Sequence, residues 1–178
     1  MATILNPQIA LKPQDLVVLF ALANRGDAGG GYAELGSTTG LAASAVHAAL
    51  KRATAAKLVN APDGKPRVLK TALKEFVLTG AKYAFPPVWG ALTRGVPTGY
   101  AAAPLNAVIA TSTDPVPVWP HAKGTTRGMS LAPLYPSVPE AAMRDEKLYA
   151  MLALFDSIRA GNAREREAAK TLLAGYLT

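Results

Sequence analysis

Residues 37–52 read STTGLAASAVHAALKR, a run of small residues that ends in two basic side chains. On a helical wheel of about 100° per residue, this run has an aliphatic face and an opposite face that is small or polar. The aliphatic face holds Val46, Ala49, Leu50 and Ala53, and the opposite face holds Ser44, His47, Ala48, Lys51 and Ala55. The pattern predicts an amphipathic helix from about Ser44, a good N-cap residue, to about Ala56.

The outer face of this predicted helix suits the major groove of DNA. Small side chains let a helix backbone approach the base edges of a groove only ~12 Å wide. Ser44 and His47 lie near the helix N-terminus, where they can hydrogen-bond to bases, and the helix dipole there favours phosphate. Lys51 and Arg52 would then reach the phosphate backbone. Gly40 is expected to make the turn into the helix, because glycine tolerates a positive φ.

Composition agrees with a globular, basic protein. The chain has 178 residues, half of them apolar, which is enough for one ordinary domain or a small domain with an extension. The net charge is +7, and residues 1–80 hold nine Lys and Arg against five Asp and Glu. Such a charge favours an anionic partner, of which nucleic acid is the commonest. The chain has no cysteine, which excludes disulfides and thiolate metal sites and fits the cytoplasm. We expect neither a signal peptide nor a membrane-spanning helix.

Other elements are expected on both sides of this helix. Helical spacing after Pro13 predicts a first helix to about residue 23, ended by a glycine run at 29–31, and a short helix at 32–38. Two apolar pairs flank Pro62-Asp63-Gly64-Lys65, so residues 57–70 are predicted to form a short hairpin. A further helix is expected at 71–83.

The middle of the chain, residues 85–139, holds ten of the 14 prolines. It also keeps many aromatic and aliphatic residues, so it is expected to be ordered and turn-rich, with short strands at 105–110 and 116–119. Thr-Arg-Gly followed by Ala-Pro-Leu occurs at 93–105 and again at 126–134. This echo is either a coincidence of composition or a duplicated docking segment.

Residues 140–178 are expected to form two helices. Gly161 and Asn162 interrupt the apolar spacing, and Asn162 is a good cap for the second helix. This segment carries six basic and six acidic residues. Two interpretations remain open for the pair: it dimerises the chain, or it covers the core.

Residues 32–59, YAELGSTTGLAASAVHAALKRATAAKLV, resemble the helix-turn-helix of winged-helix transcription factors. The matching positions are Leu35, Gly40-Leu41, Ser44, Val46, Leu50 and Leu58-Val59. With the basic hairpin that follows, residues 12–83 look like a MarR-like bacterial regulator. The resemblance implies a mainly α fold with a small β-hairpin wing. It does not extend to the Pro-rich segment or the C-terminal helices, so the family's dimer geometry is not carried over.

The resulting domain prediction has three parts: a winged helix-turn-helix DNA-binding domain at 1–84, a Pro/Gly-rich ordered connector at 85–139, and a C-terminal helix pair at 140–178. The function expected is sequence-specific binding of double-stranded DNA by a cytoplasmic homodimer, with repression as the outcome. The predicted DNA contacts are Ser44, His47, Ala48, Lys51, Arg52, Lys57, Lys65 and Arg67. If about four cations per chain meet phosphates, the affinity should fall as roughly the 3.6 power of salt concentration for a monomer and as about twice that power for a dimer.

Three alternatives are weighed against this expectation. Residues 85–139, with Arg94 and Arg127, could dock a protein partner, as in a winged-helix adaptor or an antitoxin-like subunit. A small-molecule effector could bind among Phe85, Trp89, Tyr100 and Trp119, although aromatic residues more often pack a core. An enzyme is disfavoured, because the two histidines, His47 and His121, have no metal-ligand spacing and no nucleophile or phosphate-loop motif occurs. No cofactor and no metal are expected.

Overall fold

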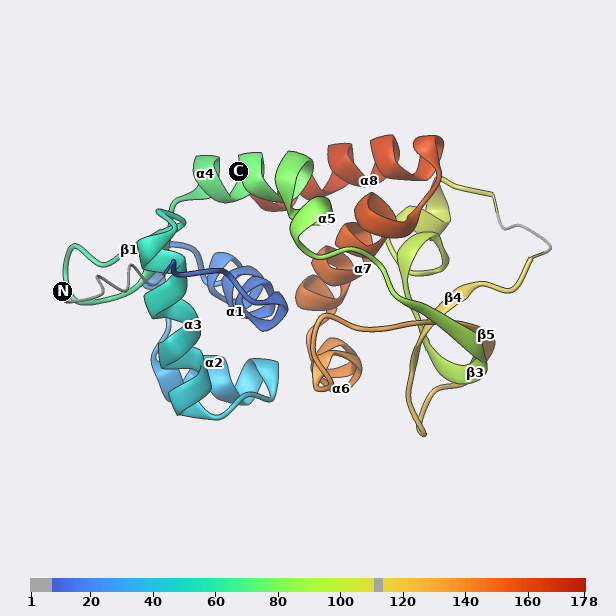
Figure 1. The fold of residues 1–178 in the computed structure, drawn as a ribbon, viewed down its shortest axis with the longest axis horizontal. Coiled ribbons are helices and arrows are strands. Elements are labelled where there is room, and N and C mark those ends of the chain that lie inside the picture. Colours follow the sequence, from blue (N-terminus) through green and yellow to red (C-terminus); the bar gives the residue numbers. More distant parts are fainter. Residues whose placement is uncertain (1–7, 111–113) are drawn as a thin grey trace, which may run out of the picture.

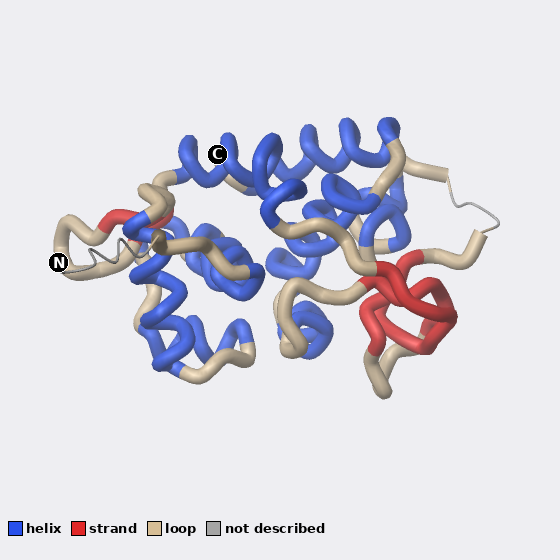
Figure 2. Tube along the Cα trace, in the orientation of Figure 1, coloured by secondary structure: helices blue, strands red, loops and turns tan. Residues whose placement is uncertain are grey.

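The computed structural model describes residues 8–110 and 114–178, in which helices predominate and two small sheets supply the strands (Figures 1 and 2). The helices are α1 (Pro13–Ala23), α2 (Tyr32–Thr39), α3 (Ala43–Ala55), α4 (Lys70–Glu75), α5 (Ala81–Ala84), α6 (Val138–Arg144), α7 (Glu146–Ala160) and α8 (Ala163–Tyr176). The strands are β1 (Val59–Asn60), β2 (Arg67–Val68), β3 (Trp89–Pro97), β4 (Pro117–Pro120) and β5 (Thr126–Leu131). Within the described ranges, no helix is long and apolar enough to cross a bilayer.

The N-terminal third packs three helices against a short hairpin. Helix α1 is buried continuously from Asp15 to Leu22 and contacts both α2 and α3. Strands β1 and β2 pair antiparallel, with Val59 opposite Val68, as the two apolar pairs predicted. Helices α4 and α5 are joined by a π-helical turn at Phe76–Gly80, so the chain is helical from Lys70 to Ala84, close to the expected 71–83.

The Pro-rich segment folds into a closed three-stranded barrel (Figure 2). Strand β3 pairs antiparallel with β4 and with β5, and β4 pairs parallel with β5. The two Thr-Arg-Gly triplets are antiparallel partners, since Arg94 lies opposite Arg127. The echo in the sequence therefore corresponds to a real pairing. The strand expected at 116–119 is confirmed, but the one at 105–110 is wrong, because Leu105–Ala107 form a 3-10 turn.

Close backbone approach explains why glycines sit in these strands. A Cβ on Gly128 would lie 2.0 Å from the carbonyl oxygen of Val116, and one on Gly95 would lie 2.1 Å from that of Trp119. Real side chains do not tolerate such distances. The three strands can close on one another only because these positions carry no side chain.

Gly128→Ala is therefore expected to destabilise the fold by about 1–3 kcal/mol or more, the usual cost of overpacking. Gly175→Ala is the matched control, because a Cβ there meets nothing within 4 Å and α8 gains about 1 kcal/mol of helix propensity. Urea unfolding followed by circular dichroism measures both variants. An unchanged midpoint for Gly128→Ala would mean that the barrel does not close as described.

Helix α7 is the centre of the molecule. Nearly all of its side chains from Leu148 to Arg159 are buried. It contacts α1, α5, α6 and α8, and the ring of Phe155 meets that of Phe20 edge-on at 6.3 Å between centroids. In Figure 1 it lies between the N-terminal helices and the barrel. The buried hydrophobic residues of the N-terminal, middle and C-terminal segments form one continuous core.

The C-terminal segment differs from the expected helix pair in one respect. Its first helix is divided into α6 and α7 at Asp145, whose extended backbone breaks the helix while its side chain accepts a hydrogen bond from the Leu148 amide at 3.0 Å. The break at Gly161 and the cap at Asn162 are confirmed, and Glu165 completes a capping box. Helix α7 is covered by its own chain, whereas α8 keeps an exposed outer face.

Candidate nucleic-acid interface

Helices α2 and α3 are joined by a tight turn at one end of the molecule, opposite the barrel (Figure 1). Gly40 ends α2 with φ of 73°, the left-handed conformation that was expected of it. The aliphatic face of α3 points inward as predicted: Val46, Ala49, Leu50 and Ala53 are all buried. Contacts with α1 and α2 cover this face and fix the orientation of the helix.

The opposite face of α3 is open to solvent. Ser44, His47, Lys51 and Ala55 are exposed, and Ala48 is half-buried. Ser44 is not the N-cap: the helix begins at Ala43, and Ala42 precedes it with no side-chain cap. Ser44 therefore lies in the first turn, close to amide groups that no side chain caps. Such amides can hydrogen-bond to phosphate oxygens.

Tyr32, which no pattern in the sequence singled out, belongs to the same surface. Its ring meets that of His47 edge-on, with 5.2 Å between centroids, and Tyr32 is itself exposed. Tyr32 is the first residue of α2, and His47 lies at the start of the second turn of α3. No sequence periodicity connects them, because the contact depends on the angle between the helices.

Arg52 has a structural role in place of the expected contact with DNA. Its Nε and Nη2 atoms donate to the Asp15 carboxylate at 2.7 and 2.6 Å. The Asp15 side chain is fully buried, and Asp15 also accepts from the Lys12 amide at 2.9 Å. The hydrogen bonds with Asp15 raise the pKa of Arg52 above its ordinary value. This ion pair ties α3 to α1, so Arg52 is not available for a phosphate.

The remaining predicted cations fall into two groups. Lys51, Lys57 and Lys65 are exposed and make no ion pair within the described residues. Arg67 is paired with Asp63 across the hairpin turn at 2.6 Å. Lys70, just after the hairpin, donates to the backbone oxygen of Thr178 at 2.8 Å. Within the described residues, three of the predicted cations are therefore free of ion pairs, one fewer than the four assumed from the sequence.

Lys57 adopts an unusual backbone conformation. Its φ is 61°, a region that costs a non-glycine residue roughly 1 kcal/mol or more. It follows the last turn of α3, and the next amide, that of Leu58, bonds back to Ala53 at 2.9 Å. Glycine is the usual residue at this position. A lysine here keeps a cation between α3 and the hairpin at the expense of some stability.

The glycine run contacts the hairpin and thereby positions it. Gly29 has φ of 65°, and a Cβ on it would lie 3.0 Å from the Pro66 carbonyl oxygen. Arg25 contacts α2 near both of its ends, where it pairs with Glu34 and donates a hydrogen bond to Thr38 Oγ1 at 3.1 Å. A shallow groove lies between this loop and the hairpin turn, with Tyr32 and Lys65 among the residues that line it.

In the described parts of the chain, no three His, Asp or Glu side chains lie close enough together to hold a metal ion. The two histidines have different neighbours: His121 lies 3.6 Å from a carboxylate oxygen of Glu140, and the ring of His47 meets that of Tyr32.

Comparisons of the chain with protein-family models, with curated proteins and with solved structures find no match. Any inference about function therefore rests on the arrangement of residues in this structure.

Proposed function

We propose that this chain binds double-stranded DNA in a sequence-specific manner and regulates transcription in the cytoplasm of a bacterium. The observation that carries the proposal is the outer face of α3. It joins small and polar side chains to an exposed lysine, Lys51, on an amphipathic helix that a tight turn connects to α2. In this proposal α2 and α3 form a helix-turn-helix, and β1 and β2 form the wing of a winged helix-turn-helix domain.

The proposed contacts divide by role. Ser44 and His47 read base edges, Ala48 lets the backbone approach the groove, and Lys51, Lys57 and Lys65 meet phosphates. Tyr32 supports the His47 ring at 5.2 Å between centroids. A single domain of this kind reads few bases, so we propose a homodimer that places two copies of α3 about 34 Å apart on a palindromic site. Repression follows where that site overlaps a promoter.

Reversing the charge of Lys51 tests the proposal. Lys51→Glu is expected to weaken DNA binding by about tenfold or more and to reduce the magnitude of the salt slope by about 0.9 per chain, because each chain of the dimer loses one phosphate contact. Arg164→Glu is the control, since Arg164 is exposed on α8 near its start, at the barrel end. Fluorescence anisotropy with a labelled duplex measures both. Equal loss for the two variants would indicate a nonspecific charge effect and contradict the assignment.

Base readout predicts a different response. The double variant Ser44→Ala, His47→Ala is expected to cost about 1–3 kcal/mol on the preferred site and much less on random DNA, because these side chains contact bases in the proposal. Selection of bound sequences from a random pool, repeated with the variant, measures the change in preference. If the ratio of specific to nonspecific affinity is unaffected, these residues do not read sequence.

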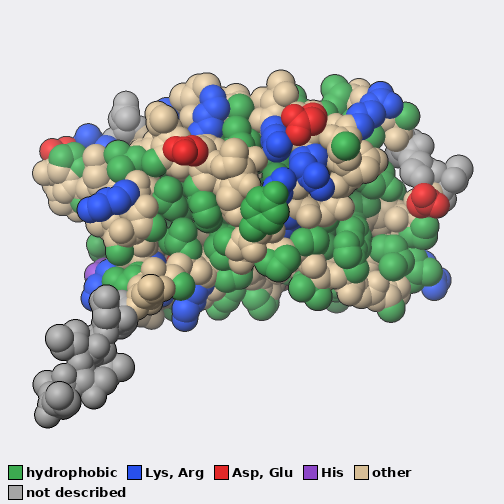
Figure 3. Space-filling view, turned by 45° about the horizontal axis from the view of Figure 1, so that its top comes forward, with side chains coloured by type: hydrophobic (Ala, Val, Ile, Leu, Met, Phe, Trp, Pro, Cys, Tyr) green, Lys and Arg blue, Asp and Glu red, His purple; other side chains and the backbone are tan. Residues whose placement is uncertain are grey.

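A second candidate function is supported by an apolar surface near the barrel. Tyr83 is 77% exposed, Val88 is 62% exposed, and Trp89 and Leu92 are about half exposed. In Figure 3 hydrophobic side chains cover a broad area of the visible face, and basic side chains lie at several places around it. Large exposed apolar surface is typical of protein contacts. A protein partner docked on residues 83–92 would make the chain an adaptor or antitoxin-like subunit.

Two variants separate the candidates. If the adaptor function is the main one, Leu92→Ser should abolish capture of the partner that co-purifies with the chain, and Lys51→Glu should leave that capture unchanged. If DNA binding is the main function, Lys51→Glu should remove binding to DNA and Leu92→Ser should preserve it.

A further inference from the structure

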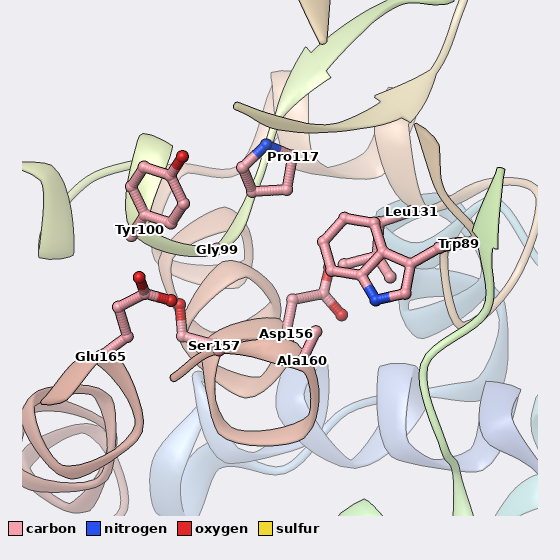
Figure 4. A pocket seen from close by; sticks show the side chains of 10 residues that line it. Trp89, Gly99, Tyr100, Pro117, Leu131, Asp156, Ser157, Ala160 and Glu165 are labelled. Atoms are coloured by element: carbon pink, nitrogen blue, oxygen red, sulfur yellow. The ribbon is translucent and has the colours of Figure 1, made fainter. Parts of the chain in front are cut away.

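A small cavity lies at the opposite end of the molecule from α3, where the barrel meets the end of α7 (Figure 4). Each barrel strand contributes one lining residue, and the remainder come from the turn Gly99–Ala101, from α7 and α8, and from Gly161 between these two helices. The lining residues are Trp89, Gly99, Tyr100, Pro117, Leu131, Asp156, Ser157, Ala160, Gly161 and Glu165. Its volume is about 80 Å³, more than a water molecule needs and enough for a group of a few heavy atoms.

One polar atom in this cavity is buried without a partner. Ser157 is 2% exposed, and its Oγ makes no hydrogen bond within the described residues. A buried hydroxyl that lacks a partner costs about 1–3 kcal/mol, so such groups usually mark a ligand or a bound water. Figure 4 shows the Ser157 hydroxyl on the same side of the cavity as the Glu165 carboxylate, with the Tyr100 ring above them.

The charged groups of the cavity are all acceptors. Glu165 and Asp156 are carboxylates, and none of the lining residues is basic. The charge of Asp156 is compensated by Arg159, which donates from Nε at 2.7 Å, whereas Glu165 accepts hydrogen bonds from its own cap residue, Asn162. The C-terminal end of α7 brings the negative pole of a helix dipole to the cavity, and the N-terminal end of α8 brings a positive pole, so the negative side chains rather than the helix ends set the charge of the site. Burial, together with Glu165 and Asp114, raises the pKa of Tyr100, so its hydroxyl stays neutral.

The apolar walls of the cavity are suited to a cation as well. Trp89 and Tyr100 present aromatic rings, whose electron-rich faces attract ammonium and guanidinium groups. Gly99 has φ of 58°, and a Cβ there would approach the Ser157 Oγ to 3.4 Å and Pro117 Cγ to 3.2 Å. The absence of a side chain at Gly99 therefore leaves space next to the Ser157 hydroxyl.

We propose that this cavity binds a small organic cation, a primary ammonium or guanidinium group on a short alkyl chain. The charged head lies between Glu165 and the Ser157 hydroxyl, and the alkyl chain passes along the rings of Tyr100 and Trp89 toward solvent. Trp89 is half exposed and forms the rim. The site lies away from α3, and its occupancy does not depend on whether the chain binds DNA.

The test uses the full chain and four probes of matched length: n-butylammonium, n-butylguanidinium, n-butanol and butyrate, at constant ionic strength. The two cations are expected to shift the emission of Trp89 in a saturable manner. Trp89→Phe removes that response and thus separates it from the emission of Trp119. If n-butanol or butyrate binds as tightly as the cations, or if neither cation gives a saturable response, the proposal is overturned.

Two variants assign the contacts. Glu165→Gln keeps the capping box, because Gln serves in this motif as well as Glu. Its loss of charge is expected to weaken the binding of both cations about tenfold. Glu167→Gln is its control, because Glu167 is exposed on the same helix and pairs with Lys170. Ser157→Ala should weaken the binding of the cations several-fold. The free protein should remain at least as stable, because the variant removes a buried hydroxyl that has no hydrogen-bond partner within the described residues. Equal affinity of Glu165→Gln and wild type would contradict the assignment of the charged head.

Discussion

Replacing Asp156 with alanine is expected to lower the free energy of unfolding by about 3–5 kcal/mol, the typical result of removing one member of a buried ion pair. Asp156 is 2% exposed and accepts hydrogen bonds from three segments of the chain. Its Oδ2 accepts from Thr98 Oγ1 at 2.7 Å and from Trp119 Nε1 at 2.6 Å, and its Oδ1 accepts from Arg159 Nε at 2.7 Å.

Loss of this carboxylate leaves a buried guanidinium, an indole N–H and a hydroxyl without their acceptor. Arg159 would keep a single close bond of 2.7 Å, to the carbonyl oxygen of Ala132. Because the network joins α7 to the barrel and to the turn at 99–101, we expect the barrel to loosen first. Urea unfolding gives the total change, and hydrogen exchange shows where protection is lost.

The double variant Asp156→Ala, Arg159→Met is the control for this prediction. Removing both charges together should restore part of the lost stability, because buried ion pairs replaced by apolar side chains are often neutral or better. If Asp156→Ala costs less than about 1 kcal/mol, the carboxylate is not buried and bonded as described.

Arg52→Met is expected to cost a similar amount, about 3–5 kcal/mol, because it leaves the Asp15 carboxylate buried without its cation. The Asp15 side chain is fully buried, and the Arg52 side chain is only 18% exposed. Asp15 would retain its bond from the Lys12 amide at 2.9 Å, which compensates only part of the charge. Chemical denaturation measures the change.

Lys51→Met is the matched control, since it removes the neighbouring cation from an exposed position that makes no ion pair within the described residues. Its expected effect on stability is within about 0.5 kcal/mol, as for most surface substitutions. In DNA-binding assays the two variants should differ in the opposite sense. Lys51→Met is expected to reduce the salt dependence of the affinity, whereas Arg52→Met, where it is still folded, is expected to leave that dependence unchanged. The reverse pattern would assign Arg52 to a phosphate.

Local pattern in the sequence was sufficient for the parts of the fold that are determined by neighbouring residues. The buried and exposed faces of α3 follow from a 3.6-residue period, and the turn at Gly40 follows from glycine's freedom to adopt a positive φ. The hairpin at 57–70 and the Asn162 cap are likewise local. These features were predictable because each depends on residues a few positions apart.

Long-range contacts were not predictable in the same way. The bond between Arg52 and Asp15 joins residues 37 positions apart, so Arg52 looked like a free cation beside Lys51. Strands β3 and β5 carry glycines that weaken any strand pattern, and those glycines are explained only by the approach of other strands. The repeated Thr-Arg-Gly indicated a relationship between the two segments, but not that they pair.

The proposed site was predicted in part. Ser44, His47 and Lys51 lie together on an exposed face as expected, whereas Arg52 and Arg67 are engaged in ion pairs. Tyr32 was missed because its contact with His47 depends on the packing of α2 against α3. Of the four aromatic residues considered for a pocket, Phe85 and Trp119 are buried in the structure, and Trp89 and Tyr100 line the cavity.

The central claim, that the outer face of α3 binds DNA, is tested most directly by the salt dependence of binding. Wild-type protein and Lys51→Glu are titrated by fluorescence anisotropy against the duplex upstream of its own gene, between about 50 and 200 mM salt. Three phosphate contacts per chain, and thus six per homodimer, predict a log–log slope of about −5.4 for wild type and a shallower slope with weaker binding for Lys51→Glu. Absence of wild-type binding at the lowest salt, or identical curves for the two proteins, would contradict the account.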